Sequence, residues 1–459
     1  MTPSRTTTTA IVGGGASGVL TAINLLSRSA DPDLRVTLHE ATGIVGRGVA
    51  YGTNDPRHLL NVRARHMSAF PDEPADLIEW ARRTGRSRDA QAFLPRQDYA
   101  AYLQDRLAGV ADHRLSIRAG RVDDVARVGE GYEVRSADCV THADTVVLAY
   151  GNLRPRPLVV DGDELPEAPW HLPDPWDLGR LRLLPPDATV LLVGTGLTAV
   201  DTALTLLGDG APGRRVVMVS RHGLLPRRHV EQQSTAWVPD VPEGPLTADG
   251  LVAMFREQVA AARRHGVNWR AVVDGLRAPT QDIWLRLPLA ERRRFLAEHA
   301  REWEVRRHRM APEVADRLEG YVAEGRLDVR ADALGALGDR GERCVVGLLR
   351  SGPVEVDAVV NCTGPLTDIT RSGDPLLLAM RERGLVSPDP LLLGVASTPE
   401  GELLDEEGRI VPGLYAVGPP RRGTLYESTA IPEIRTQAAE VASAVLTRRA
   451  ESRARVAIS

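Results

Sequence analysis

The stretch TTTTAIVGGGASGVLTAINLL, residues 6–26, decides the fold. Its β-branched and apolar beginning, residues 6–12, predicts a buried parallel strand, and the apolar spacing at its end predicts a helix. Between them lies the spacing GxGxxG, with its glycines at Gly13, Gly15 and Gly18. In this context the first glycine permits a tight turn, the second lets the backbone approach a pyrophosphate, and the third lets helix and strand pack closely. The segment therefore predicts a dinucleotide site.

The residues that follow narrow the choice of nucleotide. Ala16 and Ser17 open the predicted helix, whose free N–H groups would bind the phosphates. The next predicted strand, residues 34–39, ends at Glu40. An acidic residue at this position accepts hydrogen bonds from both ribose hydroxyls and repels a 2′-phosphate. The first site therefore fits FAD or NAD and does not fit NADP.

Three later segments favour FAD at the first site. DTVVLAYGN (144–152) and DAVVNCTGP (357–365) are short apolar strands that run into turns at Gly151 and Gly364. In two-dinucleotide flavoproteins such strands mark the places where the chain crosses between domains. VPGLYAVG (411–418) ends at Gly418 and precedes a helix predicted from about Pro432. In these folds the N-terminus of that helix faces the flavin pyrimidine, where negative charge collects on reduction.

A second glycine-rich turn follows the apolar segment 188–193. It reads GTGLTA, a GxGxxA variant of the same fingerprint, and its candidate cofactor contacts are Gly194, Gly196, Leu197 and Thr198. Its own second strand, residues 214–219, ends at Ser220 and Arg221. These two residues offer a hydrogen-bond donor and a positive charge for a 2′-phosphate, which favours NADPH over NADH. The alternative is that Arg221 is an ordinary surface arginine.

Together the two turns predict an α/β fold with two Rossmann-like dinucleotide-binding domains, as in two-dinucleotide-binding flavoproteins, and a helical insertion. Residues 1–160 and 345–459 would form a discontinuous FAD-binding domain, and residues 186–345 the NAD(P)H-binding domain. Helices are expected between about 247 and 325, with Gly266 ending one of them.

Composition excludes several other classes of protein. All 57 basic residues are arginine, so Schiff-base chemistry and a P-loop, which need lysine, are ruled out. Cys139, Cys344 and Cys362 are too far apart in sequence for a CxxC pair, which disfavours a dithiol reductase. The net charge of −4 gives no reason to expect nucleic acid or a membrane as partner. The N-terminus reads as a strand of the fold and not as a signal peptide, so a cytoplasmic location is expected. The pattern indicates no cluster of metal ligands and no Ser-His-Asp arrangement.

Several segments carry a family resemblance. GRGVAYGTNDPRHLLNVRARHMSAFP (46–71), FLPRQDYAAYL (93–103), SRHGLLPRRH (220–229), WEVRRHR (303–309) and GPPRRGTLYESTAIPEIRTQA (418–438) span nearly the whole chain. With IVGGGASG before them, they resemble the bacterial FAD/NAD(P)-binding family that includes aspartate N-monooxygenases forming nitrosuccinate. The layout is also distantly similar to class B flavin monooxygenases, including the ornithine and lysine N-hydroxylases.

The resemblance implies roles for particular residues. It places the candidate catalytic residues beside the isoalloxazine: Asn61, His66, Met67 and Ser68. An acidic substrate would need cationic partners, for which the candidates are Arg65, His66, Arg96 and Arg309. One departure is Pro419, which stands where many flavoproteins carry an aspartate for the ribityl chain. Asn61 and His66 could instead satisfy loop backbone, and the arginines could be surface residues.

Three functions compete at this point. The leading one is a monooxygenase in which NADPH reduces FAD and oxygen from O₂ is transferred to a small amine, with aspartate the first candidate. The second is a reductase or dehydrogenase that passes electrons to a quinone or a partner protein. The third is a non-catalytic flavin-binding sensor. The sequence does not set the oligomeric state.

Overall fold

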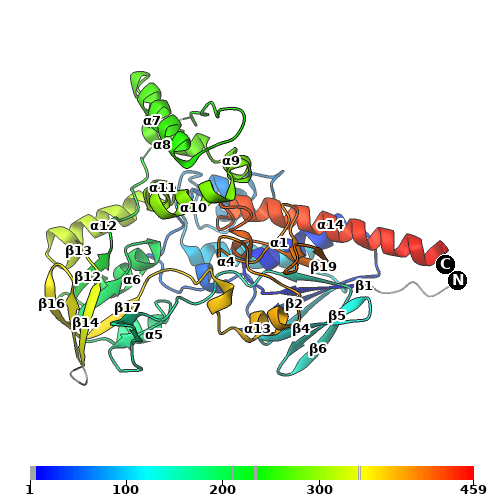
Figure 1. Ribbon diagram of the computed structural model, residues 1–459, viewed down its shortest axis with the longest axis horizontal. Coiled ribbons are helices and arrows are strands. Elements are labelled where there is room, and N and C mark those ends of the chain that lie inside the picture. Colours follow the sequence, from blue (N-terminus) through cyan, green and yellow to red (C-terminus); the bar gives the residue numbers. More distant parts are fainter. Residues whose placement is uncertain (1–6, 209, 232–234, 340, 342, 459) are drawn as a thin grey trace.

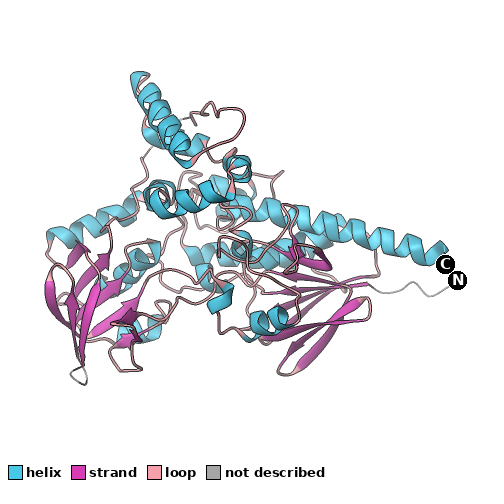
Figure 2. Cartoon of the chain, in the orientation of Figure 1, coloured by secondary structure: helices cyan, strands magenta, loops and turns pink. Residues whose placement is uncertain are grey.

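The computed structural model describes residues 7–458, except residues 209, 232–234, 340 and 342. Thr6, the predicted first residue of the opening strand, lies outside the described residues. Two strand-rich regions lie toward opposite ends of the long axis, with helices between and above them (Figure 2). Among the described residues, no helix is long and apolar enough to cross a membrane.

The first sheet has six strands in the order β18-β19-β7-β1-β2-β3. Its central strand β1 pairs in parallel with β2 and with β7, and all four residues of β7 are buried, as expected of apolar strands covered on both faces. Helices α1 (Ala16–Arg28), α4 (Arg96–Val110) and α14 (Ile431–Ile458) contribute to the core that covers this sheet. The strands are β1 (Thr7–Val12), β2 (Leu34–Glu40), β3 (Leu115–Ala119), β7 (Thr145–Leu148), β18 (Glu402–Leu404) and β19 (Ile410–Ala416).

The second sheet has five parallel strands in the order β10-β17-β11-β12-β13. Helices α6 (Leu197–Leu207) and α12 (Pro312–Ala323) pack against it through a separate hydrophobic core. Its strands are β10 (His171–Leu172), β11 (Thr189–Val193), β12 (Arg215–Ser220), β13 (Leu327–Ala331) and β17 (Ala358–Asn361).

Strand β17 changes the domain boundary expected from the sequence. The expected boundary at residue 345 would give residues 358–361 to the first domain, but this strand pairs with β11 of the second sheet. The antiparallel strands just before it, from residue 334 onward, belong to the same end of the molecule (Figure 1). We therefore place the return crossing after Asn361, where Cys362 begins the turn.

Smaller strand groups complete both ends. A three-stranded antiparallel sheet follows β3, and another precedes β17. They comprise β4 (Val122–Val128), β5 (Gly131–Ser136) and β6 (Cys139–Ala143), then β14 (Leu334–Asp339), β15 (Cys344–Leu348) and β16 (Gly352–Val356); a short pair joins β8 (Val159–Val160) to β9 (Asp163–Glu164).

The predicted helical insertion is present between β12 and β13. Helix α7 ends at Arg264 and Gly266 follows with φ +71°, so the expected helix stop is correct. Helices α10 and α11 lie beside the start of α14, while α7 projects away (Figure 1). The insertion comprises α7 (Ala248–Arg264), α8 (Trp269–Gly275), α9 (Thr280–Arg286), α10 (Leu289–Glu298) and α11 (Ala300–Arg307). The remaining helices are α2 (Gly48–Tyr51), α3 (Asp76–Arg83), α5 (Leu178–Leu183) and α13 (Pro375–Glu382), with 3₁₀ turns η1 (Ala64–His66), η2 (Ile369–Arg371) and η3 (Pro419–Arg421).

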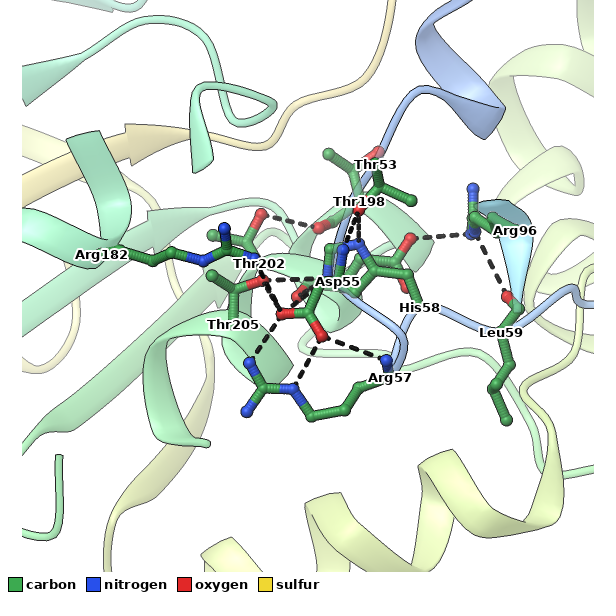
Figure 3. A network of polar contacts seen from close by, with 11 residues as sticks. Thr53, Asp55, Arg57, His58, Leu59, Arg96, Arg182, Thr198, Thr202 and Thr205 are labelled. Carbon is green, nitrogen blue, oxygen red and sulfur yellow. Dashed lines mark hydrogen bonds and ion pairs between the residues drawn. The ribbon is translucent and has the colours of Figure 1, made fainter. Parts of the chain in front are cut away.

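A buried polar network joins the two domains (Figure 3). His58, from the first domain, donates from Nε2 to the carbonyl oxygen of Asp201 on α6 at 2.9 Å, and its Nδ1 lies 2.8 Å from Thr53 Oγ1. The Thr205 hydroxyl of α6 donates to Asp55 at 3.0 Å. Because burial lowers the pKa of His58, outweighing the two nearby carboxylates, the imidazole is neutral and suits these partners. The network fixes α6 against the first domain.

His39, at the end of β2, should make stability depend on pH. It is buried, both ring nitrogens lack a hydrogen-bond partner among the described residues, and burial together with Arg118 lowers its pKa to about 4. Only the unfolded chain takes up this proton between pH 6.5 and 4, so up to about 3 kcal/mol of stability is lost as the pH falls. Urea unfolding at pH 7.5, 5.5 and 4.5 should show a weaker pH dependence in His39→Leu than in the wild type. The exposed-site control His113→Leu should retain the wild-type dependence, and equal slopes in all three proteins would contradict this assignment.

Candidate functional site

The first glycine turn is shaped by two close backbone approaches. Gly13 has φ +106°, and a Cβ there would overlap the Ala149 carbonyl after β7. A Cβ on Gly18 would overlap the Gly13 carbonyl oxygen, so α1 packs on β1 only with glycine at this position. These two glycines are therefore required by the fold itself.

Gly15 differs, because the space beside it is open. A Cβ there would meet only backbone atoms of Gly48, at 3.5 Å. Helix α1 begins just after it, with neither a side-chain cap nor an acidic residue in its first turn among the described residues. Its unbonded N–H groups, at Ala16 and Ser17, suit an anionic group such as a pyrophosphate.

Glu40 is held at the edge of this turn. Its Oε2 accepts from Gly14 N at 3.0 Å, and its Oε1 accepts from the backbone and hydroxyl of Thr42 at 3.0 and 2.9 Å. A carboxylate has lone pairs beyond these three bonds, so ribose hydroxyls can still donate to it. The residues at the first turn thus fit an FAD adenosine and pyrophosphate, as the sequence predicts.

Gly418 brings the third predicted FAD segment to the same place. It has φ +84°, a Cβ on it would overlap the Ser17 hydroxyl, and its N–H donates to Gln437 of α14 at 2.9 Å. Gly151 also has a positive φ with open space beside it, as expected for a turn after β7. Gly364 follows β17 of the second sheet, so its contact with FAD stays a prediction.

The second glycine turn repeats the geometry of the first. Gly194 has φ +127°, and a Cβ there would overlap the Cys362 carbonyl. Gly196 has open space, and α6, which begins with Leu197 and Thr198, has no side-chain cap or acidic first-turn residue among the residues described. Ser220 ends β12, and Arg221 is exposed beside it. All predicted second-site residues therefore lie around one turn.

Two residues at this second turn were not identified from the sequence. The Thr195 hydroxyl lies 2.8 Å from Ser220 Oγ. Arg301, from α11 of the helical insertion, donates from Nη2 to Thr195 Oγ1 at 3.0 Å. Thr195 could have been recognised from its place between Gly194 and Gly196, but no local pattern indicates that Arg301 reaches the turn.

An arginine cluster lies where segment 61–68, the start of α14 and the helical insertion meet. Arg277 donates from Nε and Nη2 to Glu433 at 2.6 and 2.7 Å, and Arg307 Nη2 lies 3.0 Å from Glu427 Oε2. Arg435 of α14 donates to the Ser68 carbonyl at 2.9 Å. We use the name arginine cluster for Arg277, Arg307, Arg309 and Arg435 with their acidic neighbours Asp274, Glu427 and Glu433.

The arginine cluster has an excess of donors. Its four guanidinium groups face three carboxylates, which leaves one net positive charge. The Nε groups of Arg307, Arg309 and Arg435 are buried without a hydrogen-bond partner among the described residues. Buried donors of this kind need an acceptor, and a carboxylate-bearing ligand would supply it.

Two neutral histidines border the arginine cluster. His229 donates from Nε2 to the Asn61 carbonyl at 3.1 Å, and burial and the charge of Arg309 lower its pKa to about 3. His66 keeps an exposed edge, but partial desolvation by the surrounding protein and the charge of Arg65 lower its pKa to about 4. Arg65 Nε donates to His66 Nε2 at 2.9 Å, so Asn61, Arg65 and His66 lie beside this cluster, and their contact with the flavin or the substrate stays a prediction.

The structure corrects three of the predicted site residues. Met67 is 2% exposed within the core around α1, and the Ser68 hydroxyl donates to the Glu73 carbonyl at 2.7 Å, with the Phe70 carbonyl as a longer alternative acceptor at 3.1 Å. Both side chains stabilise the loop, which corrects their predicted catalytic role. Arg96 forms an ion pair of 2.7 Å with Asp201 and donates to the Leu59 carbonyl, so it joins the domains instead of binding substrate (Figure 3). Arg309 stays in the arginine cluster, paired with Asp274.

One group of possible metal ligands is brought together on the insertion. Asp249, Glu298 and His299 lie close to one another near the protein surface. Arg294 lies 2.7 Å from Asp249 and 3.4 Å from Glu298, so its charge already balances part of that of the two carboxylates.

Comparison with known families supports the geometry of the first site. Residues 10–153 match the FAD-NAD(P)-binding family. The match agrees with the predicted cofactor class, FAD together with NAD(P). No curated protein sequence matches the chain.

Solved structures confirm the predicted fold class. Ornithine hydroxylase from Pseudomonas aeruginosa is 17% identical with a TM-score of 0.62, over 96% of this chain and 98% of that one. L-lysine 6-monooxygenase from Pseudomonas syringae is 18% identical with a TM-score of 0.61, over 96% and 99%. Bacillithiol disulfide reductase from Staphylococcus aureus is 13% identical with a TM-score of 0.56, over 97% and 99%. At these identities the likeness establishes the fold and leaves the reaction open.

Gly15→Ala should separate cofactor binding from folding. The added methyl group has room in the protein but occupies the space of the pyrophosphate, so FAD affinity should fall at least about tenfold with little change in thermal stability. Titration of the apoprotein with FAD, followed by flavin fluorescence, measures this loss. Gly18→Ala is the matched control, because its methyl group would overlap the Gly13 carbonyl and should lower stability itself. Wild-type FAD affinity in Gly15→Ala would contradict the assignment.

Proposed function

We propose that the chain is an FAD-dependent, NADPH-using monooxygenase that oxidises the nitrogen of a small acidic amine, with L-aspartate the first candidate and a nitrosuccinate-type product. The observation that carries the proposal is the arginine cluster, with its net positive charge and its buried Nε donors. It lies against the segment 61–68 and the N-terminal end of α14, which the sequence predicts to border the flavin. FAD, when bound and reduced by NADPH, supplies the oxygen-activating chemistry.

The protein's own groups would bind and orient the substrate. Arg309 and Arg307 are buried and can form charge-assisted hydrogen bonds with carboxylates, which are stronger in a site sheltered from water. A dicarboxylate amine would bring two such groups and leave its nitrogen free to face the flavin. The two fold relatives named as ornithine and lysine oxygenases act on basic amines, so this cationic cluster is the feature that favours an acidic one here.

The cysteines argue against a thiol-based reductase, although the fold is shared with disulfide reductases. Cys362 is buried beneath the second glycine turn, and burial raises the pKa of its thiol to about 12. Cys344 is buried in the core between β15 and β16 and the second sheet. The Cys362 thiol is therefore not available as a thiolate nucleophile near pH 7, and burial keeps Cys344 from reaching a disulfide substrate.

Oxygen consumption tests the reaction directly. With enzyme, NADPH and O₂, aspartate or glutamate should accelerate both NADPH oxidation and O₂ uptake, whereas succinate, which lacks the amine, should yield no oxidised product. The amine must lose a proton to react, and His66 and His229 titrate too low to take it, so the rate should rise between about pH 7 and 9. Stimulation by ornithine or lysine alone would overturn the acidic substrate. NADPH oxidation driven by a quinone without O₂ uptake would favour the reductase reading.

Arg309→Gln should weaken binding of the amine substrate and leave the reduction of the flavin by NADPH intact. Losing one charge-assisted contact should raise the KM for the amine about 10- to 150-fold, while the rate of flavin reduction by NADPH measured without the amine changes little. Arg306→Gln is the matched control, because Arg306 lies three residues before Arg309, near the end of α11, but is paired with Glu302 at the surface. FAD content and melting temperature report whether the variants are folded. Equal KM values in both variants would remove Arg309 from the substrate site.

A further inference from the structure

Helix α11 connects the helical insertion to the second nucleotide site. Near its start, Arg301 donates to Thr195 Oγ1 at 3.0 Å and to the Leu224 carbonyl. Thr195 Oγ1 lies in turn 2.8 Å from Ser220 Oγ, at the end of β12. The guanidinium is thus one hydroxyl group away from the residue expected to lie beside the nucleotide ribose.

Comparison of the two turns in this chain shows which part of the nucleotide lies there. Gly13 N donates to the His39 carbonyl, and Gly194 N donates to the Val219 carbonyl. Ser220 therefore corresponds to Glu40, and Thr195 to Gly14. Gly14 N donates to the Glu40 carboxylate, and the Thr195 hydroxyl contacts the Ser220 hydroxyl, so the same two positions are joined in both turns, by different groups. In this fold the residue at the Glu40 position contacts the adenosine ribose. Ser220 occupies that position in the second turn, so Arg301, which contacts Thr195 next to it, would lie beside the ribose of the second nucleotide and away from the nicotinamide.

The charge around Arg301 is unbalanced. Among the described residues, neither Arg301 nor the exposed Arg221 forms an ion pair with a carboxylate. Glu302 and Glu304, the two acids that act electrostatically on Arg301, are themselves paired, Glu302 with Arg306 and Glu304 with Arg422 at 2.7 Å. Burial lowers the pKa of Arg301 and the charge of Arg221 lowers it further, against the opposite effect of the two glutamates, so the Arg301 and Arg221 guanidinium groups lie within electrostatic range of each other. Two such groups beside one ribose suit a doubly charged anion.

We propose that Arg301 binds the 2′-phosphate of NADPH together with Arg221, so that the helical insertion helps to select NADPH over NADH. The proposal rests on the NADPH use stated under the proposed function. It assigns a specificity role to a residue 106 positions away from the turn that it contacts.

The competing role is binding of the pyrophosphate. Arg301 could reach over the turn toward the N-terminus of α6, where the pyrophosphate of either cofactor would lie. A pyrophosphate contact would strengthen NADPH and NADH equally, whereas a 2′-phosphate contact would strengthen NADPH alone. The two roles therefore differ in a ratio that can be measured without turnover.

The experiment measures ligand dissociation constants on the oxidised FAD-loaded protein. Its ligands are NADP⁺, NAD⁺, and the fragments 2′,5′-ADP and 5′-ADP, titrated by calorimetry. In Arg301→Ala, and in Arg221→Ala, the constants for NADP⁺ and 2′,5′-ADP should rise about 10- to 150-fold, with NAD⁺ and 5′-ADP within about twofold of wild type. Arg301→Lys should recover part of the loss, and Arg306→Ala, on the same helix, should change nothing.

The outcomes separate this inference from the proposed function. If the wild type prefers NADP⁺ and the Arg301→Ala variant has the same preference, the role of Arg301 is overturned and the proposed use of NADPH is not. An equal loss for all four ligands would assign Arg301 to the pyrophosphate or to support of the turn, and would also overturn it. A wild-type protein that binds NAD⁺ as tightly as NADP⁺ would overturn the proposed use of NADPH itself.

Discussion

Two helices, α1 and α6, begin with backbone N–H groups that have no side-chain cap, and neither helix has an acidic residue in its first turn, among the described parts of the chain. The turn before each helix contains a glycine with positive φ, Gly13 or Gly194. Each glycine lies against the carbonyl group that directly follows the neighbouring parallel strand, that of Ala149 after β7 or of Cys362 after β17. Side chains cannot fill these places without moving the sheet, and the N–H groups remain available for an anion. Each of the two domains therefore presents one anion-binding turn at the start of a helix.

The helical insertion gives the two sites a common element. Helix α11 carries Arg301 at the second glycine turn, and Arg307 lies at its other end in the arginine cluster. The cluster also includes Glu433 of α14, so the insertion is tied to the first domain by ion pairs that include Arg277. The contacts of His58 and Arg96 with α6 complete the connection between domains. A substrate site built at this junction draws its charges from both domains.

Much of the fold was predictable because its signals are local. The strand, GxGxxG turn and helix of residues 7–28 are consecutive, so their spacing alone specifies them, and the same holds for Glu40 and for the stop at Gly266. The errors arose where long-range packing decides. Met67 points into the core, Arg96 pairs with a residue 105 positions later, and β17 joins the second sheet although it follows the expected boundary. Arg301 was missed for the same reason, since no pattern within α11 indicates what its side chain contacts.

The proposed monooxygenase would use oxygen at a reduced flavin beside a bound acidic amine. Stopped-flow spectroscopy tests it most directly: the FAD-loaded protein is reduced with NADPH under anaerobic conditions and then mixed with O₂, with and without aspartate. We expect a transient absorbance that differs from those of oxidised and reduced flavin and that decays faster when the acidic amine is present. A direct return to the oxidised spectrum, at a rate that no acidic amine changes, would contradict it.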